Sequence, residues 1–153
     1  MAGKTLIVYA SKSGANSEAA NAIADALKTT YGMDITVADL KNGSPDITPF
    51  QNIIVGSGIR ATNVYKEAVD FLGRDFGDRK VALYFCCGGG GDPKTRDRSA
   101  EDNSKKVLAK NKSLKPIDVV AFGGRMKILG RVVWDNRDMN KVREWAIELG
   151  KKF

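Results

Sequence analysis

TLIVYASKSGANSE, residues 5–18, is the stretch that decides the fold. Residues 5–9 are a continuous apolar run rich in β-branched side chains, which is typical of a strand buried on both faces. The residues after this run are small and polar, and a long helical pattern follows at once. Because the first N–H groups of a helix lack partners and the helix dipole favours an anion, the stretch predicts a turn that binds a phosphate group.

The composition limits the classes of protein to which the chain can belong. Apolar residues make up 42% of the 153 residues, and no stretch approaches the ~18 apolar residues of a membrane-spanning helix. Residues 1–4 lead straight into the first strand, which leaves no room for a signal peptide. We therefore expect a cytoplasmic protein without a membrane span, formed by a single domain over residues 1–153.

The charged residues and the lack of histidine narrow the chemistry. The chain contains no histidine, which excludes Ser-His-Asp triads, Cys-His pairs and His-ligated metal sites. The net charge of +7 suits an acidic protein or anionic lipid as partner, although scattered surface lysines explain it equally well. No basic run is interleaved with aromatic residues, so we expect no nucleic-acid partner.

Strand and helix patterns alternate along the chain. Strands are predicted at residues 5–9, 33–39, 52–55, 80–85 and 118–122, and helices at residues 16–31, 64–72, 101–111 and 138–150. Strands separated by helices form parallel sheets with right-handed crossovers. The predicted fold is therefore α/β, with a doubly wound five-stranded parallel sheet of strand order 2-1-3-4-5.

Three loops are predicted to meet at one edge of this sheet. Ligands of such sheets bind at the carboxyl ends of the strands, beside the point where the strand order reverses. The loops at that edge are residues 11–17, 57–63 and 86–96. We expect the ligand to contact all three.

The loop motifs resemble those of a known family. Over essentially its full length, the chain is similar to flavodoxin-type FMN proteins, whose phosphate loop of Thr or Ser with Gly resembles SKSGAN at residues 11–16. Two further motifs, IIVGSGIR at residues 53–60 and AFGGR at residues 121–125, resemble the branch of menaquinone-dependent protoporphyrinogen oxidases of bacteria. That branch carries a long basic, helical insertion after the fifth strand, whereas only residues 123–137 stand there in this chain.

The resemblance implies a flavodoxin-like fold and FMN as the cofactor. The sequence agrees, because no Gly-x-Gly-x-x-Gly follows the first strand, as a dinucleotide-binding fold would need. The candidate cofactor-binding residues are Ser11, Lys12, Ser13, Gly14, Ala15, Asn16 and Ser17 in the first loop, Ser57, Gly58, Ile59, Arg60, Ala61 and Thr62 in the second, and Cys87, Gly88, Gly89 and Gly90 in the third.

The first loop has two interpretations. Its serine hydroxyls, the Asn16 amide, the Lys12 charge and the backbone N–H groups suit a phosphate group. Serine and asparagine are also favoured helix caps, so a plain N-cap is the alternative.

The predicted ring loops lack the aromatic residues with which flavodoxins usually sandwich the flavin ring. Tyr65 and Trp134 are the nearest candidates to cover the ring, and ordinary packing is the alternative for both. The glycines at 56, 58 and 88–91 would let the backbone approach the ring edge. Cys86 and Cys87 end the fourth strand, and we interpret them as small buried residues rather than as redox thiols.

Several cations are predicted near the ring. They are Arg60, Lys94, Arg96, Arg125, Lys127 and Arg131. Because nearby cations favour a reduced, anionic flavin, they predict a less negative redox potential than in acidic flavodoxins, unless the side chains simply face water.

Three functions are compatible with this sequence. The first is an FMN-binding electron carrier whose partner is another redox protein, of an acidic, ferredoxin-like type. The second is an FMN-dependent oxidase resembling the protoporphyrinogen oxidases, with a quinone as acceptor. The third is a binding module that has lost FMN, against which the intact first loop argues.

Overall fold

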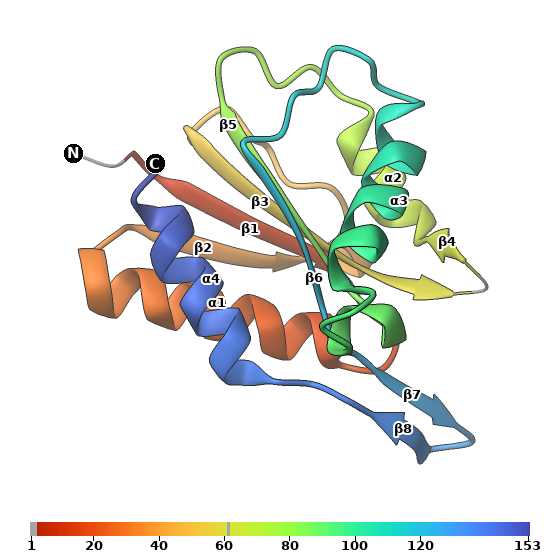
Figure 1. Ribbon diagram of the computed structural model, residues 1–153. Coiled ribbons are helices and arrows are strands. Elements are labelled where there is room, and N and C mark those ends of the chain that lie inside the picture. The colour runs from red at the N-terminus through yellow and green to blue at the C-terminus, as the bar shows by residue number, and fades with distance from the viewer. Residues whose placement is uncertain (1–2, 61) are drawn as a thin grey trace.

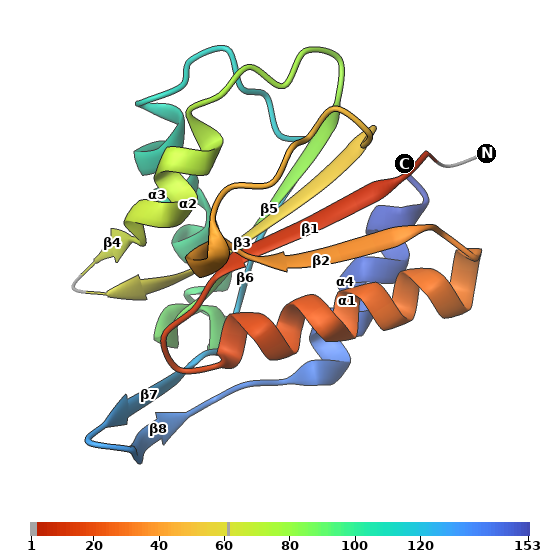
Figure 2. The same cartoon turned by 180° about the vertical axis from the view of Figure 1, so that it is seen from behind.

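The fold is a five-stranded parallel sheet with helices on both faces (Figures 1 and 2). The computed structural model describes residues 3–60 and 62–153. The strands are β1 (Thr5–Ala10), β2 (Ile35–Asp39), β3 (Asn52–Arg60), β4 (Asn63–Val64), β5 (Lys80–Cys86), β6 (Asp118–Phe122), β7 (Arg125–Ile128) and β8 (Arg131–Asp135). The α-helices are α1 (Ala15–Tyr31), α2 (Lys66–Leu72), α3 (Arg96–Leu108) and α4 (Met139–Gly150), and the 3₁₀ turns are η1 (Leu40–Asn42) and η2 (Gly88–Gly91).

The order of the strands confirms the predicted fold. The parallel strands run β2-β1-β3-β5-β6, which is the predicted order 2-1-3-4-5 once the short β4, antiparallel to β3, is set aside. Along one line of the sheet, Ala10 pairs with Ser57 and Ser57 pairs with Phe85. The carboxyl ends of β1, β3 and β5 therefore meet at the same edge.

The central strands are buried on both faces, as their continuous apolar sequences predict. In β1, Ile7 packs into the layer beneath α1 and α4, whereas Leu6 and Val8 pack into the layer beneath α2 and α3. All three side chains are fully buried. Successive residues of a strand point to opposite faces, so one strand supplies both cores.

The second predicted loop is wrong in part, because β3 continues through it. Ser57 and Gly58 pair with β5, and Ile59 and Arg60 turn back to pair with β4. The glycine at 56 serves packing rather than flexibility, since a Cβ there would lie 1.9 Å from Cζ of Tyr84. The helix predicted at residues 64–72 is two residues shorter at its start, because α2 begins at Lys66.

The third predicted loop is shorter than expected. The glycine run forms the turn η2. Helix α3 begins at Arg96, ahead of the helix that the sequence predicts at residues 101–111. The backbone N–H of Ser99 donates to the Thr95 carbonyl at 2.9 Å, so the helical bonds start there. Polar residues in this first turn hid the helix from the apolar pattern.

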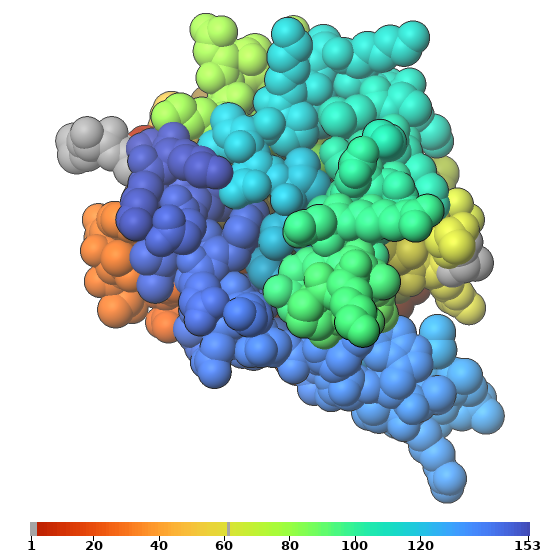
Figure 3. Space-filling view, viewed as in Figure 1, coloured from red at the N-terminus to blue at the C-terminus, as the bar shows by residue number. Residues whose placement is uncertain are grey.

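A hairpin that the sequence analysis missed follows β6. Strands β7 and β8 form a separate two-stranded antiparallel sheet that projects away from the body (Figures 1 and 3). Its apolar residues lack a core beneath them, so the pattern resembled an ordinary connection. None of the helices in the described part of the chain has the length and apolar character that crossing a bilayer requires.

A buried hydrogen bond joins the sheet to the start of α1. The hydroxyl of Tyr84 donates to the Asn16 carbonyl at 2.9 Å, and the Tyr84 side chain is fully buried. Burial raises the pKa of Tyr84, so the phenol stays protonated and can donate. This bond holds the first turn of α1 against β5.

We predict that Tyr84→Phe lowers the free energy of unfolding by about 1 kcal/mol, because it removes a buried hydrogen bond between the sheet and α1. Urea denaturation would measure the change. The matched control is Tyr9→Phe, which removes a hydroxyl for which no hydrogen bond is found among residues 3–60 and 62–153. Equal stabilities of the two variants would contradict the prediction.

Candidate functional site

Helix α1 begins without a side-chain cap. Its N-cap is Gly14, in the left-handed conformation with φ of 85°, and no side chain bonds to the first turn. The N–H of Gly14 donates to Ser11 Oγ at 3.1 Å, which shapes the turn before the helix. For the N–H groups of Ala15, Asn16 and Ser17, the described residues supply no acceptor. The alternative of a plain N-cap therefore fails, and these donors are free to bind an anion.

The Asn16 side chain places an unpaired acceptor in the same turn. Asn16 is 2% exposed, and its Oδ1 has no hydrogen-bond partner in the described part of the chain. An unpaired buried acceptor is costly unless a ligand or water pairs with it. A hydroxyl group of a bound ligand would satisfy this atom.

Arg125, at the start of β7, holds the turn from outside. Its side chain is mostly buried, and its Nε donates to the Ser13 carbonyl at 3.1 Å. The Glu18 carboxylate lies 3.7 Å from the Arg125 guanidinium and also pairs with Arg137. These contacts link the first loop of the chain to the β7–β8 hairpin.

A cavity of about 290 Å³ opens beside this turn. Its walls come from the first loop, the ends of β3 and β5, the start of α2 and the β7–β8 hairpin. The lining residues are Lys12, Ser13, Ala15, Asn16, Gly58, Ile59, Arg60, Tyr65, Cys86, Cys87, Arg125, Met126, Lys127, Ile128 and Trp134. We call this space the edge cavity.

The structure brings about half of the sequence-predicted residues to the edge cavity. The first and second loops supply most of them: Lys12, Ser13, Ala15, Asn16, Gly58, Ile59, Arg60 and Cys87. Ser11, Gly14 and Ser17 form the turn behind it without lining it. The prediction for Ala61 lies outside the described residues.

Two residues of the second loop lie elsewhere. Ser57 is buried, and its Oγ donates to the Gly58 carbonyl at 2.8 Å and accepts from the Tyr65 N–H at 3.1 Å. Thr62 is exposed in the turn before β4, with φ of 66°. The Ser57 hydroxyl is thus committed to the chain itself, and neither side chain lines the edge cavity.

The glycine run of the third loop serves packing more than approach to a ligand. Gly89 makes room for Ser99, and Gly90 is buried against the backbone of Phe122. Gly88 lies against Trp134, since a Cβ at this position would be 3.7 Å from Cη2 of the indole ring. Gly88, Gly89 and Gly90 therefore do not line the edge cavity, and their contact with a ligand stays a prediction.

Both aromatic candidates line the edge cavity. Tyr65 packs on Gly58, and Lys12 Nζ lies 5.1 Å from the centroid of its ring. Trp134, from β8, pairs with Met126 across the hairpin. Met126 and Ile128 are lining residues that the sequence analysis missed, and their only signal was an apolar alternation in residues 125–128.

The edge cavity is cationic. Lys12, Arg60, Arg125 and Lys127 line it, and no carboxylate does among the residues that the structure describes. Of the other cations that the sequence placed near the ring, Arg96 donates instead to the Gly90 carbonyl at 3.0 Å. Lys94 and Arg131 do not line the cavity either.

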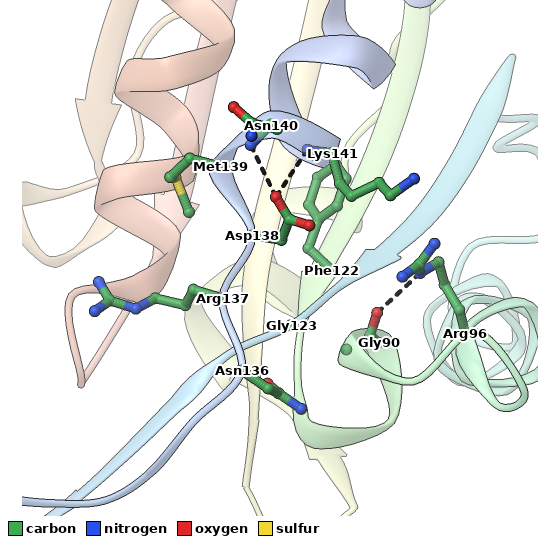
Figure 4. Close-up of a pocket in the computed structure, with 11 residues that line it drawn as sticks. Gly90, Arg96, Phe122, Gly123, Asn136, Arg137, Asp138, Met139, Asn140 and Lys141 are labelled. Atoms are coloured by element: carbon green, nitrogen blue, oxygen red, sulfur yellow. Dashed lines mark hydrogen bonds between the residues drawn. The ribbon is translucent and has the colours of Figure 1, made fainter.

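A second cavity, of about 440 Å³, lies beside the start of α4 (Figure 4). Asp138 already caps this helix, since its carboxylate accepts from the N–H groups of Asn140 and Lys141 at 3.0 and 3.4 Å. The backbone donors that an anion would need are therefore occupied. Of the two helix starts, that of α1 is the one prepared for a ligand.

A known protein family and several solved structures match this chain. The family model described as "Flavodoxin domain" matches residues 6–147. The chain belongs to the flavodoxin domain family. The family membership confirms the resemblance to flavodoxins at this level, and no curated protein matches the sequence.

Solved flavodoxin structures share the fold of this family member. An oxidised flavodoxin 2 from Bacillus cereus has a TM-score of 0.68 at 20% identity, over 98% of this chain and 99% of that one. A flavodoxin from Fusobacterium nucleatum bound to flavin mononucleotide has a TM-score of 0.61 at 15% identity, over 99% of each chain. A flavo di-iron protein variant from Thermotoga maritima reaches 0.65 at 20% identity, over 98% of this chain and 36% of that one.

The two cysteines are protonated thiols beside the edge cavity. Burial raises the pKa of Cys86 far above its usual range, and burial also raises the pKa of Cys87. A thiol that keeps its proton is a poor nucleophile and metal ligand. Both cysteines are free, and Cys86 is buried as interpreted, whereas Cys87 is partly exposed.

We predict that the raised pKa of Cys86 makes the fold less stable at high pH. The unfolded thiol ionises near pH 8.5, whereas the folded one keeps its proton, so stability falls as the pH rises above that value. Between pH 7.5 and 9.5, the wild type should lose about 1.4 kcal/mol more than Cys86→Ala. Urea denaturation across this range would measure both, and parallel pH profiles would contradict the assignment.

Proposed function

We propose that this chain binds FMN at the edge cavity and transfers electrons to and from another redox component. The observation that carries the proposal is the uncapped start of α1, at the carboxyl edge of the sheet and beside the edge cavity. The flavodoxin family membership supports FMN as the cofactor. So does the shared fold with a flavodoxin that was solved with flavin mononucleotide.

The residues of the turn fit the phosphate end of FMN. The free N–H groups of Ala15, Asn16 and Ser17 would donate to the phosphate, and the Lys12 ammonium would balance its charge. A ribityl hydroxyl would donate to the unpaired Oδ1 of Asn16. Four charge-assisted hydrogen bonds contribute roughly 6–12 kcal/mol against an association cost of ~4–15 kcal/mol, so the ring must supply the rest of the affinity.

The other walls fit the ring end. Tyr65 and Trp134 offer aromatic surface, and Met126 and Ile128 offer apolar surface, for a flat ring. When bound, FMN supplies the one- and two-electron chemistry, for which no general acid or base of the protein is needed. The side chains of this chain orient the cofactor and set the charge around it.

The cations of the edge cavity bear on the redox potential. Reduction adds negative charge to a flavin, and the exposed cations Arg60 and Lys127 at the rim of the edge cavity would stabilise that charge. The absence of carboxylates among the described lining residues removes the opposing repulsion. The proposal therefore includes a less negative potential than that of an acidic flavodoxin.

The partner is proposed from charge alone. A net charge of +7 and a cationic cavity rim favour an acidic redox protein of the ferredoxin type, with a quinone as the alternative acceptor. The cytoplasmic location that the sequence predicts stays a prediction.

The oxidase function is the second candidate. The resemblance of residues 53–60 and 121–125 to protoporphyrinogen oxidases motivates it, and the apolar hairpin beside the edge cavity is the observation in its favour. Steady turnover of a porphyrinogen with a quinone as acceptor would support the oxidase. Absence of this turnover in the FMN-bound protein would exclude the oxidase and leave the carrier.

The first test of the proposed function is a titration with FMN. The purified protein should bind one FMN per chain, with the visible bands of an oxidised flavin. We predict that Ser17→Asp weakens FMN binding by tenfold or more, on the order of 1.4 kcal/mol, because it places a carboxylate in the anion-binding turn. The same change should not destabilise α1, since acidic residues are favoured in a first helical turn.

Two controls make this titration specific. Ser17→Asn keeps the size of the side chain without its charge, so its FMN affinity should stay near that of the wild type. Riboflavin lacks the phosphate, so its affinity should be the same for Ser17→Asp and the wild type. A wild type that ignores FMN would identify the fold as a binding module, and equal FMN affinity of Ser17→Asp would place the phosphate elsewhere.

We predict that Arg60→Gln makes the potential of the second one-electron reduction of the bound FMN more negative by about 40 mV, because one cation near the ring is worth about 1 kcal/mol. A redox titration with reference dyes would measure the shift. Lys110→Gln, on an exposed lysine at the end of α3, is the control and should leave the potential unchanged. A potential that does not respond to Arg60→Gln would show that this side chain faces water.

A further inference from the structure

The β7–β8 hairpin concentrates the exposed apolar surface of the molecule. Six large hydrophobic side chains are exposed in the described part of the chain, and five of them lie between residues 126 and 133. Two of these five, Met126 and Ile128, also line the edge cavity. Leu129, Val132 and Val133 do not line it, so a bound cofactor gives no reason for their exposure. We call residues 129–133 the hairpin tip.

The end of the tip combines an unfavourable backbone conformation with an exposed leucine. Leu129 is 98% exposed, and it has a positive φ of 51°, followed by Gly130 with φ of 78°. Two-residue hairpin turns with two positive φ values favour Asn, Asp or Gly at the first position. A leucine there is strained and buries nothing within the chain, so its benefit must come from something outside the molecule.

The tip also exposes both of its valines. Val132 and Val133 are 52% and 55% exposed, and Val133 has no cross-strand partner because the register of the hairpin shifts there. The tip projects from the body as a narrow extension (Figure 3). A narrow extension whose apolar side chains are exposed can insert into a fluid interface.

The charges around the tip have one sign. Lys127 and Arg131 flank Leu129 and are exposed, and no acidic residue occurs between Arg125 and Trp134. Cations beside an inserted apolar residue suit the anionic headgroups at a bilayer surface. An acidic protein would satisfy these charges but would not require the exposed leucine and both valines.

We infer that the hairpin tip docks the protein on an anionic lipid bilayer, with Leu129 inserted among the acyl chains and Arg131 at the headgroups. The binding is peripheral, because one short hairpin buries little apolar surface and two signals, apolar and cationic, act together. It does not depend on FMN, because residues 129–133 do not line the edge cavity. Docking would place the rim of that cavity at the membrane surface.

The test is sedimentation of the full chain with vesicles. Vesicles of phosphatidylcholine with phosphatidylglycerol should bind the protein at physiological salt, and vesicles of phosphatidylcholine alone should bind it much less. Leu129→Asn should lower the partition coefficient by about tenfold or more, since it removes the inserted side chain. Because asparagine suits a positive φ, this variant should be at least as stable as the wild type, which excludes misfolding as the cause.

Matched variants separate the two contributions. Leu129→Met keeps an apolar side chain and should bind like the wild type. Arg131→Gln should lower binding to anionic vesicles about fivefold, whereas Lys110→Gln, distant from the hairpin, should lower it far less. Failure of FMN binding with vesicle binding intact would sink only the proposed function.

Three results would overturn the inference. The first is a wild type that does not bind anionic vesicles. The second is equal vesicle binding by Leu129→Asn and the wild type, because the protein would then adsorb by charge alone. The third is a dimer, or a complex with an acidic redox protein, that depends on Leu129 while vesicles are ignored. That result would assign the tip to a second copy or to a protein partner.

Discussion

Parallel pairing of β1, β3 and β5 is the constraint on which the rest of the structure depends. Because the three strands run in one direction and in one register, every chain segment that leaves their carboxyl ends emerges at the same edge. Three segments meet at this edge: the polar turn after β1, the hairpin after β3 and the cysteines at the end of β5. The pairing of the strands is enough to bring them together. Burial on both faces keeps these strands rigid, so the edge can carry polar and strained features.

The start of α1 is shaped by residues far away in the sequence. Tyr84 holds the Asn16 carbonyl from beneath, and Arg125 holds the Ser13 carbonyl from outside. Neither contact uses the N–H groups of the first turn, so the helix start is fixed in place while its donors stay free. A turn that is rigid before a ligand binds loses little conformational entropy on binding.

The β7–β8 hairpin joins the two proposals. Its first residue braces the anion-binding turn, its inner residues line the edge cavity, and its tip carries the apolar surface that projects from the body. A partner or surface that touches the tip would therefore lie close to a bound cofactor. This closeness would favour electron transfer. The protein would cover most of the cofactor, while one edge of the cofactor would lie near the partner.

The local pattern of the sequence was enough to predict the parallel sheet, its strand order and a polar turn before the first helix. Apolar runs such as residues 5–9 indicate a strand that is buried on both faces. Small, polar residues between such a strand and a helix indicate a turn with free backbone N–H groups. The extension of β3, the start of α3 and the hairpin could not be read in this way. Strand pairing, the pocket for Tyr84 behind Gly56 and the contact of Arg125 with Ser13 join residues that are distant in the chain. Tertiary structure alone decided which predicted residues reach the edge cavity, because that depends on where packing turns each backbone segment, as it turns Gly90 towards Phe122 and away from the cavity.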